Sequence, residues 1–316
     1  MSLLNELKYF RNFKLLASDF ISLAQEIIPD KVIFINYLDN IRQVTLKVSN
    51  HDQAVNVIES TLIPVDQAIC NQIDYQNRTP LILEDIKNAN LPEKVMSTVD
   101  NLKIGSYLGI PIVLENGQKF GALCVVDEGI SKFNEREISL LEKLVRLFSY
   151  YIELESIAYK DTLTGLYNAT FFKNYYKNQR PENGALFMID LDDFKTVNDT
   201  HGHHFGNKIL KTLGQKLLSI SNKYPDSVAI RLGGDEFLLI IPNLSKRTEL
   251  ERLANQLVNL LSVWTPLLEA NTLTASIGVI RYDNVDYDGF MSLMNNVDVA
   301  LYNAKKQGKN RASIFE

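Results

Sequence analysis

The sequence predicts a two-domain α+β protein in which a domain built on an antiparallel sheet precedes a domain built on a mixed sheet. The chain has 316 residues, enough for two ordinary hydrophobic cores. Strand-like runs separated by turn residues dominate the first part, whereas strand-like and helix-like runs alternate in the last part. A helix-like segment with a heptad pattern lies between them. The predicted boundaries are 1–133, 134–160 and 161–316.

The composition is that of a folded globular protein, with 46% hydrophobic and 22% charged residues. The net charge of −5 provides no general footprint for nucleic acid, so no such partner is expected. No run approaches the roughly 18 apolar residues that a membrane helix needs, and residues 1–30 lack the layout of a signal peptide. We therefore expect no membrane span and a cytoplasmic location. Cys70 and Cys124 stand in apolar contexts and are predicted to be core thiols rather than a disulfide or a redox switch.

The first domain begins with a helix-like segment over 15–28. The runs KVIFINYL, RQVTLKVS, YLGIPIVLENG and KFGALCVVD follow as predicted strands. Together with RTPLILEDI and FNEREISLLEKL, they resemble the GAF family over roughly residues 15–155. This resemblance implies a sensor domain for an unknown small-molecule or protein ligand. Tyr107, Asp85 and Asp127 are candidates for its pocket, with ordinary turn and rim positions as the alternative.

The connecting segment carries apolar residues at alternating spacings of four and three: Leu140, Leu144, Leu147, Tyr151, Leu154 and Ala158. This heptad seam predicts a stiff helix that pairs with its copy in a second chain. The alternative is a single helix that packs on its own domain.

In the second domain, the stretch SVAIRLGGDEFLLIIP joins two strands directly, so these strands must form a hairpin. Gly233 and Gly234 are expected at the two turn positions, because glycine permits the positive φ values of a tight primed turn. Such a turn places Asp235 and Glu236 at its lip.

A second acidic group, Asp190, Asp192 and Asp193, ends another predicted strand. If the two strands are neighbours, Asp190 and Asp235 converge and form oxygen ligands for Mg²⁺, a hard ion that also binds phosphate. The alternative is an acidic surface loop. Taken alone, Asp192 and Asp193 favour this alternative. A basic run around Gly308, containing Lys305, Lys306, Lys309 and Arg311, would balance these acids against a triphosphate; a solvated tail is its alternative.

Five motifs occur in order: DTLTGLYN, IDLDDFKTVNDTHGHHFGN, RLGGDEF, TASIGV and DVALYNAKKQGKNR. In this order they resemble the GGDEF domain of diguanylate cyclases over residues 161–315. The resemblance implies a palm-like fold of the nucleotide cyclase type, regulated by the GAF domain through the connecting signalling helix. It further implies condensation of two GTP into cyclic di-GMP with release of pyrophosphate, dependence on Mg²⁺ with Mn²⁺ as a substitute, and a homodimer, because each domain holds one nucleotide.

The resemblance also implies roles for individual residues. Asp190, the Leu191 carbonyl, Asp235 and Glu236 would bind metal, and Asp235, Glu236 and Lys195 would act in catalysis. The implied substrate-binding residues are Asp193, Phe194, Asn198, His203, Asn207, Gly233, Gly234, Lys305 and Lys309.

Three positions depart from the family pattern. Asn207 replaces an aspartate that would accept two hydrogen bonds from guanine, so a cyclic GMP-AMP or promiscuous synthase is an alternative. Tyr224-Pro225-Asp226-Ser227 replaces the RxxD product-inhibition motif, so inhibition by product is expected to be absent. Ala169 stands where arginine is common. A non-catalytic GTP-binding signalling module is the remaining alternative. The histidines at 201, 203 and 204 suit a glycine-containing loop better than a zinc site.

Overall fold

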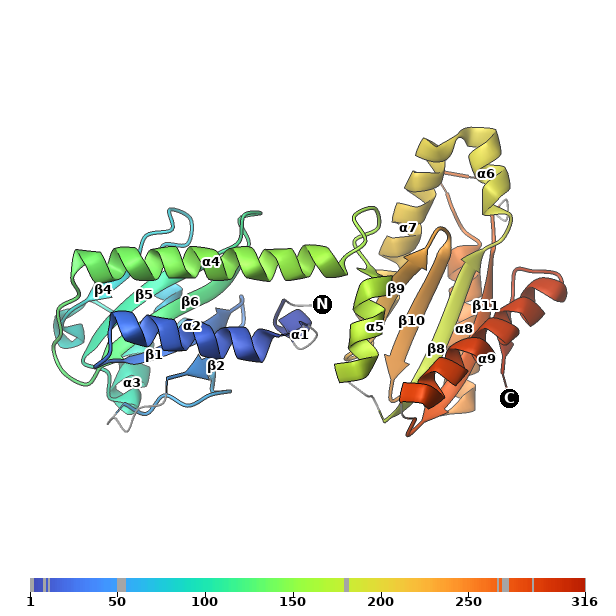
Figure 1. Ribbon diagram of the computed structural model, residues 1–316. Helices are drawn as coiled ribbons and strands as arrows, with labels where there is room; N and C mark the ends of the chain where they lie inside the picture. Colours follow the sequence, from blue (N-terminus) through green and yellow to red (C-terminus); the bar gives the residue numbers. More distant parts are fainter. Residues whose placement is uncertain are drawn as a thin grey trace. The chain divides into compact units, whose positions relative to one another are not determined.

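The computed structural model describes residues 3–7, 10, 12–49, 55–178, 182–265, 267–268, 273–285 and 287–315. The chain divides into two compact units, Ser2–Glu155 and Ser156–Glu316. The first contains an antiparallel sheet and the second a mixed sheet, which confirms the predicted α+β class (Figure 1).

The N-terminal unit is built around a six-stranded sheet with the order β3-β2-β1-β6-β5-β4. Its strands are β1 (Val32–Leu38), β2 (Arg42–Val48), β3 (Leu62–Pro64), β4 (Leu81–Leu83), β5 (Ser106–Val113) and β6 (Lys119–Asp127). Its helices are α1 (Leu3–Leu7), α2 (Phe13–Ile27), α3 (Glu93–Leu102) and most of α4 (Glu135–Tyr159), with short 3₁₀ turns η1 (Val65–Gln67), η2 (Ile69–Gln72) and η3 (Ile86–Asn88).

Both faces of this sheet are covered, so its central strands are buried throughout. On the face beneath α2 and α4, Phe148 contacts Phe20 and Phe120 at ring-centroid distances of 4.5 and 5.8 Å. The opposite face packs Phe34 and Cys124 against Val99 of α3. Uninterrupted apolar strands are therefore the expected pattern here.

Helix α4 uses only one of its sides to cover the sheet. The buried side consists of Leu141, Val145, Phe148 and Ile152. The predicted heptad seam lies on another side, where Leu140, Leu147 and Leu154 are 40%, 66% and 66% exposed. The helix thus packs on its own domain, as the alternative held, and still presents an apolar seam to its surroundings.

The C-terminal unit contains a six-stranded sheet with the order β12-β11-β8-β10-β9-β7. Its strands are β7 (Tyr167–Asn168), β8 (Asn183–Leu191), β9 (Val228–Gly233), β10 (Glu236–Pro242), β11 (Ala275–Asp283) and β12 (Ala312–Ile314). Its helices are α5 (Ala169–Asn178), α6 (Phe194–His201), α7 (His203–Ser221), α8 (Arg247–Leu261) and α9 (Tyr287–Lys306). The two edge pairs are parallel and the others antiparallel.

Strand alternation decides which side of this sheet each β8 residue faces. Phe187 and Ile189 belong to the core that includes leucines of α7 and α8. Asp190 therefore points to the opposite face, where α9 crosses the sheet (Figure 1). Lys305, at the end of α9, is within ion-pair distance of Asp190.

Candidate active site

The two acidic strand ends meet in the middle of the C-terminal sheet. Strand β10 pairs with β8 so that Glu236 lies opposite Asp190, and β10 pairs with β9 across the hairpin. The predicted convergence of the two acidic groups is confirmed, because neighbouring strands place Asp235 within electrostatic reach of Asp190.

The hairpin turn lies one residue later than predicted. Gly233 is the last residue of β9 and pairs with Glu236, so Gly234 and Asp235 occupy the turn. Gly234 has a φ of 50°, whereas Gly233 is not in the positive-φ region, so the expectation of positive φ at both glycines is wrong. A bulge between Glu236 and Phe237 shifts the register at this point. Bulges of this kind redirect side chains beside active sites.

The Asp190 carboxylate is buried close to two other carboxylates. It is 9% exposed, and burial raises the pKa of its carboxyl group, with the Asp235 and Asp192 carboxylates adding to the rise. An ion pair of 2.8 Å from Lys305 Nζ to Asp190 Oδ1 opposes this effect. A buried carboxylate beside further acids is a position that a cation stabilises.

A second ion pair lies at the start of α6. Asp193 precedes this helix with a left-handed φ of 57°, and its side chain caps none of the first amides of α6. Both carboxylate oxygens of Asp193 accept hydrogen bonds of 2.7 Å from Lys309 Nζ. Asp193 raises the pKa of Lys309, which itself has a left-handed φ of 60° beside Gly308. Two lysines and a helix N-terminus thus lie beside the acidic strand ends, an arrangement suited to phosphate.

Asp192 is not the surface residue that the sequence favoured. It is 6% exposed and accepts hydrogen bonds from Thr274 Oγ1 at 2.6 Å, Ser276 Oγ at 2.7 Å and the Asn310 amide at 3.0 Å. Thr274 immediately precedes β11, Ser276 lies in β11 and Asn310 lies in the turn after α9, so Asp192 fastens the turn that carries Lys309 to the end of β8. The small polar residues in TASIGV are the sequence signal that could have revealed this partner.

Arg231 braces the hairpin from the side, a role that the sequence analysis missed. Its guanidinium donates to the Gly234 carbonyl from Nε at 3.0 Å and Nη2 at 2.8 Å. Its Nη1 donates to Asp161 Oδ1 at 3.0 Å, and the same oxygen accepts from the amide and hydroxyl of Thr164. The first motif of the domain therefore holds the turn that carries Asp235.

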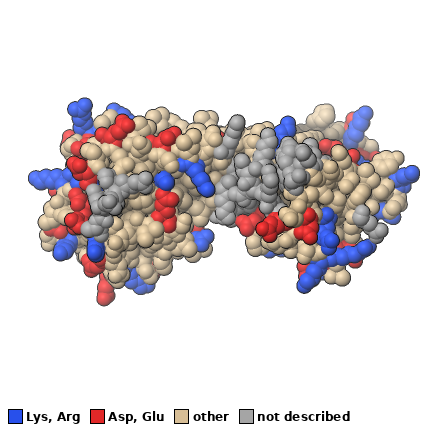
Figure 2. All heavy atoms as spheres, turned by 60° about the horizontal axis from the view of Figure 1, so that its bottom comes forward, with Lys and Arg blue, Asp and Glu red and all other residues tan. Residues whose placement is uncertain are grey.

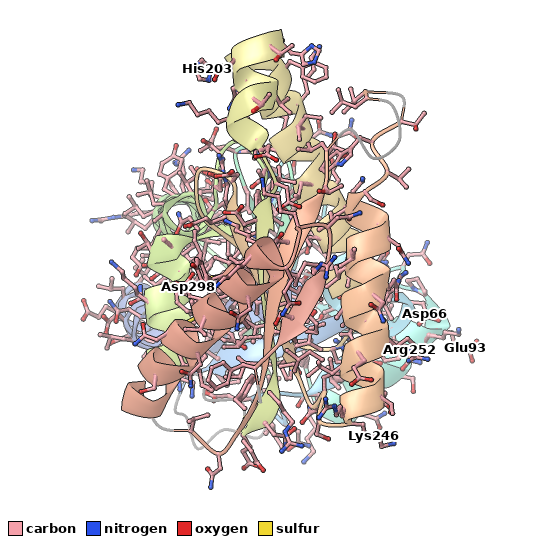
Figure 3. All side chains as sticks on the ribbon, turned by 90° about the vertical axis from the view of Figure 1, so that its right-hand side faces the viewer. Asp66, Glu93, His203, Lys246, Arg252 and Asp298 are labelled. Atoms are coloured by element: carbon pink, nitrogen blue, oxygen red, sulfur yellow. The ribbon has the colours of Figure 1, made fainter. Side chains whose placement is uncertain are left out.

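The base-recognition candidates lie where α6 and α7 pack together. An added Cβ on Gly206 would lie 1.9 Å from Asn198 Oδ1, so the glycine permits the close approach of Asn198. Asn207 follows on the exposed side of α7. His203, the first residue of α7, is exposed at the tip of this helix pair (Figure 3).

The remaining predicted residues are divided between core and surface. Phe194 is buried at 7% exposure, whereas Lys195 is exposed in the first turn of α6. Leu191 is buried at the end of β8. Within the described part of the chain, no group of three or more His, Cys, Asp or Glu side chains is close enough to hold a metal ion.

Two further expectations concern turns. Tyr224 packs partly buried against the core, Asp226 has a left-handed φ of 56°, and Ser227 is hydrogen-bonded to Ser221. In the N-terminal unit, Asp85 accepts from the Lys87 amide and Asp127 pairs with Lys31, contacts typical of the turn and rim positions that were the alternative.

Charge on the molecular surface is mixed. Figure 2 shows acidic and basic side chains interspersed over the face that it presents. Among the described residues, no helix is long and apolar enough to cross a membrane.

Comparison with known proteins assigns both units. Residues 16–152 match the GAF domain family, and residues 158–311 match the family described as diguanylate cyclase, GGDEF domain. The Vibrio cholerae diguanylate cyclase VdcA is 32% identical over 56% of this chain and 53% of its own length. The Escherichia coli diguanylate cyclase DgcP is 29% identical over 65% of this chain and 66% of its own length.

A relative named for a different activity is also similar. The Pseudomonas aeruginosa cyclic di-GMP phosphodiesterase NbdA is 28% identical over 72% of this chain, yet the match covers only 29% of NbdA. The chain thus spans less than two thirds of each of these three relatives. With both units assigned, the chain belongs to the proteins that join a GAF domain to a GGDEF domain of the diguanylate cyclase family.

Proposed function

We propose that this protein condenses two molecules of GTP into cyclic di-GMP and releases pyrophosphate. The observation that carries the proposal is the meeting of Asp190, Asp235 and Glu236 at paired strand ends, with Lys305 and Lys309 beside them. Carboxylates beside lysines and free helix amides suit a nucleotide triphosphate with its metal. The matches to diguanylate cyclases support the same reaction.

The oxygen donors at these strand ends are of the kind that Mg²⁺ prefers, with Mn²⁺ as a substitute, although among the described residues the carboxylates do not form a preassembled metal cluster. Asp190, the Leu191 carbonyl, Asp235 and Glu236 would hold the ion, and its charge would offset the burial and the neighbouring carboxylates that raise the pKa of Asp190. Bound there, the metal would neutralise phosphate charge and lower the pKa of a hydroxyl. Lys305 forms an ion pair with Asp190 and is its counterion in this structure.

The lysines and the α6 amides would bind the triphosphate. Lys305 and Lys309 pair with Asp190 and Asp193, and both lysine side chains are exposed enough to exchange partners. A triphosphate would take over these lysines while the amides of residues 193–195 bind its oxygens and Lys195 adds charge. The 3′-hydroxyl of one nucleotide then attacks the α-phosphate of the other in line, Glu236 accepts the hydroxyl proton, and pyrophosphate leaves.

The residues proposed to bind the base allow a second product besides cyclic di-GMP. Asn198 and Asn207 would contact the guanine edge from α6 and α7. An amide at 207 has one acceptor and one donor. It can therefore make only one of the two contacts that guanine offers, whereas both of its groups can pair with adenine. Asn207, which is exposed on α7, therefore makes cyclic GMP-AMP the second candidate product.

Two active sites must face each other, since each domain holds one nucleotide. The exposed seam Leu140, Leu147 and Leu154 on α4 is suited to pairing with the same helix of a second chain. We propose that this homodimer is the active form and that the GAF domain biases it by way of α4.

The test is mass spectrometry of the products after the purified chain is incubated with Mg²⁺ and GTP, ATP, or both. Cyclic di-GMP from GTP alone supports the proposal, and a mixed product from both nucleotides supports the second candidate. The matched control is Glu236→Gln, which keeps size and loses the carboxylate; its product should fall to background. GTP binding by calorimetry without any product would contradict the proposal and favour a binding module.

A further inference from the structure

Two thiols, a phenol and an amide meet inside the N-terminal unit. Cys70 lies in η2 and Cys124 in β6, and their Sγ atoms are 3.3 Å apart. Tyr107 Oη lies 3.2 Å from Cys70 Sγ and 3.3 Å from Cys124 Sγ. Asn36 Nδ2 donates to the same two sulfurs at 3.2 and 3.6 Å. All four side chains are 0% exposed, and both cysteines are free.

Three of these groups surround the Cys70 sulfur: the Asn36 amide donates to it, and the Tyr107 hydroxyl and the Cys124 thiol are within hydrogen-bond distance of it. Burial by itself would raise the pKa of the Cys70 thiol, but hydrogen bonds from Cys124, Tyr107 and Asn36 outweigh it and lower this pKa. Burial and Cys70 raise the pKa of Cys124. The surroundings thus favour ionisation of Cys70 over that of Cys124, which is the division of roles in a reactive thiol pair.

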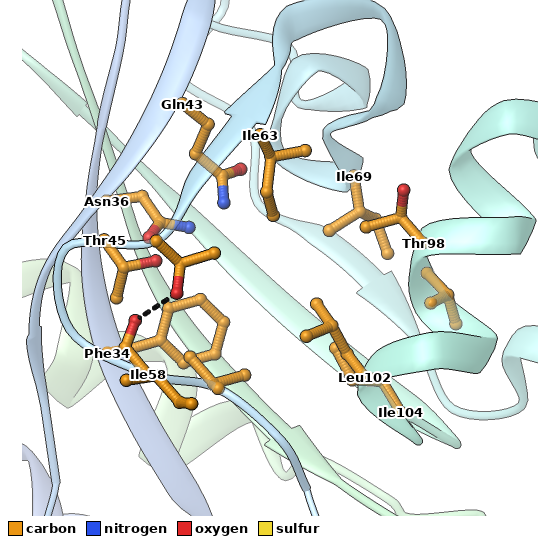
Figure 4. Close-up of a pocket in the computed structure, with 13 residues that line it drawn as sticks. Phe34, Asn36, Gln43, Thr45, Ile58, Ile63, Ile69, Thr98, Leu102 and Ile104 are labelled. Atoms are coloured by element: carbon orange, nitrogen blue, oxygen red, sulfur yellow. Dashed lines mark hydrogen bonds between the residues drawn. The ribbon is translucent and has the colours of Figure 1, made fainter.

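One member of this cluster, Asn36, also lines a small cavity (Figure 4). It is lined by Asn36, Gln43, Thr45 and Ile69 among others, has a volume of about 20 Å³, and reaches the surface beside Ile58, which is 68% exposed. This volume admits a molecule on the scale of water. Asn36 both lines the cavity and contacts the two sulfurs.

Two of the polar side chains that line this mostly apolar cavity carry an unpartnered oxygen. Among the described residues, Asn36 Oδ1 and Gln43 Oε1 are buried without a hydrogen-bond partner. Each is an acceptor that lacks a donor, and a buried acceptor of this kind favours a small molecule with O–H groups. No charged residue lines the cavity.

We propose that Cys70 and Cys124 form a peroxide-reactive thiol pair, to which hydrogen peroxide gains access through the cavity beside Asn36. The Cys70 thiolate attacks one peroxide oxygen, the O–O bond breaks, and the hydroxide that leaves takes the proton released by Cys70 to form water. The Cys124 sulfur then attacks the sulfenic sulfur of Cys70, and its own proton leaves with the second hydroxide as water. Two thiols lose two electrons, and one peroxide becomes two waters.

The geometry requires little movement for the second step. A disulfide brings its sulfurs to about 2.05 Å, so the pair at 3.3 Å must approach by about 1.3 Å. The new bond would link η2 to β6, two segments that are 54 positions apart in the sequence. This inference is independent of the proposed cyclase activity.

The experiment uses the full-length chain, reduced, freed of reductant and treated with hydrogen peroxide. The protein is then denatured, alkylated and digested for mass spectrometry. We expect a peptide pair joined through Cys70 and Cys124, loss of both alkylatable thiols, and recovery of both on addition of dithiothreitol. Two alkylated thiols after a peroxide dose that oxidises surface methionines would overturn the proposal, as would disulfides only between chains.

A variant separates a prepared thiolate from mere proximity. Tyr107→Phe keeps the ring and removes one donor to Cys70, so the rate of disulfide formation should fall by about tenfold, the effect of one pKa unit on the thiolate fraction. Tyr37→Phe, a buried tyrosine in the same unit outside this cluster, is the matched control and should leave the rate unchanged. Equal rates for both variants would overturn the role of Tyr107 and of the prepared thiolate.

Discussion

Asn207 is the single residue that most directly affects base choice in the proposed reaction. Its amide can accept only one of the two hydrogen bonds that guanine N1–H and its amino group offer. The side chain is exposed at the α7 surface next to Gly206 and Asn198, so it can be exchanged without disturbing the core.

Replacing Asn207 with aspartate should therefore improve GTP recognition. The second acceptor is worth about 1 to 3 kcal/mol, so we expect the KM for GTP to fall by about 5- to 160-fold and any adenine-containing product to disappear. Steady-state kinetics and product analysis measure this. Asn222→Asp, the same change at the other end of α7, is the control. Unchanged KM and product for Asn207→Asp would remove this residue from base recognition.

The residues at 224–227 carry a second prediction at this scale. No arginine is present there to bind a product phosphate in bidentate fashion, and Tyr224 packs against the core instead. We expect micromolar cyclic di-GMP to leave the initial rate unchanged. Inhibition that Tyr224→Phe leaves intact would place a product site elsewhere, whereas inhibition that this variant abolishes would contradict the prediction directly.

At the scale of elements, the packing of α6 on α7 positions Asn198. A Cβ at residue 206 would lie 1.9 Å from Asn198 Oδ1, closer than any real contact. Gly206→Ala should displace Asn198 and raise the KM for GTP by about tenfold, while thermal unfolding changes little because alanine favours helix. Lys211→Ala, an exposed change on α7, is the control. A normal KM in Gly206→Ala would show that Asn198 does not contact the nucleotide.

Arg231 of β9 connects Asp161, which precedes β7, to the turn between β9 and β10. Burial raises the pKa of Asp161, but hydrogen bonds from Thr164 and the ion pair with Arg231 outweigh it and lower this pKa in the folded state. The carboxylate therefore stabilises the fold fully above its unfolded pKa of about 3.9, and this contribution is lost as pH falls through the lower folded value.

Asp161→Asn should accordingly lower the free energy of unfolding by about 1 kcal/mol at pH 7, since the ion pair is only partly buried. The difference from the unmodified chain should shrink near pH 3. Urea unfolding at both pH values tests this, with Asp298→Asn, an exposed carboxylate on α9, as the control. A difference that stays constant with pH would mean that the charge of Asp161 contributes nothing.

At the scale of the whole molecule, the exposed seam of α4 determines the proposed assembly. Leu147 and Leu154 are each 66% exposed, so charged residues there should leave each unit folded. The double variant Leu147→Glu, Leu154→Glu should sediment as a monomer and lose most cyclase activity, because two nucleotide-loaded domains no longer meet. Arg146→Glu, on the same helix outside the seam, is the control. A fully active monomer would contradict the proposed dimer.

Much of the site was predictable from local sequence pattern. Two strands joined by two glycines must form a hairpin, and an acidic end on the neighbouring strand then brings Asp190 beside Asp235. The heptad spacing on α4 likewise identified a seam that is exposed, because helical periodicity depends only on the chain itself. The exact turn was not predictable, since the bulge at Glu236 follows from pairing with β9.

Contacts between distant segments were decided only by the tertiary structure. From the sequence, Asp192 was expected to be a surface acid. In the fold it accepts hydrogen bonds from Thr274, Ser276 and Asn310, which are all more than 80 positions away. Cys70 and Cys124 were two unrelated core thiols by sequence, yet the packing of η2 on β6 places their sulfurs in contact. The sequence by itself determined the domain families, the acids and the heptad seam, because these depend on local pattern. Burial, pairing and pKa depend on which distant side chains surround a group, and only the folded chain decides that.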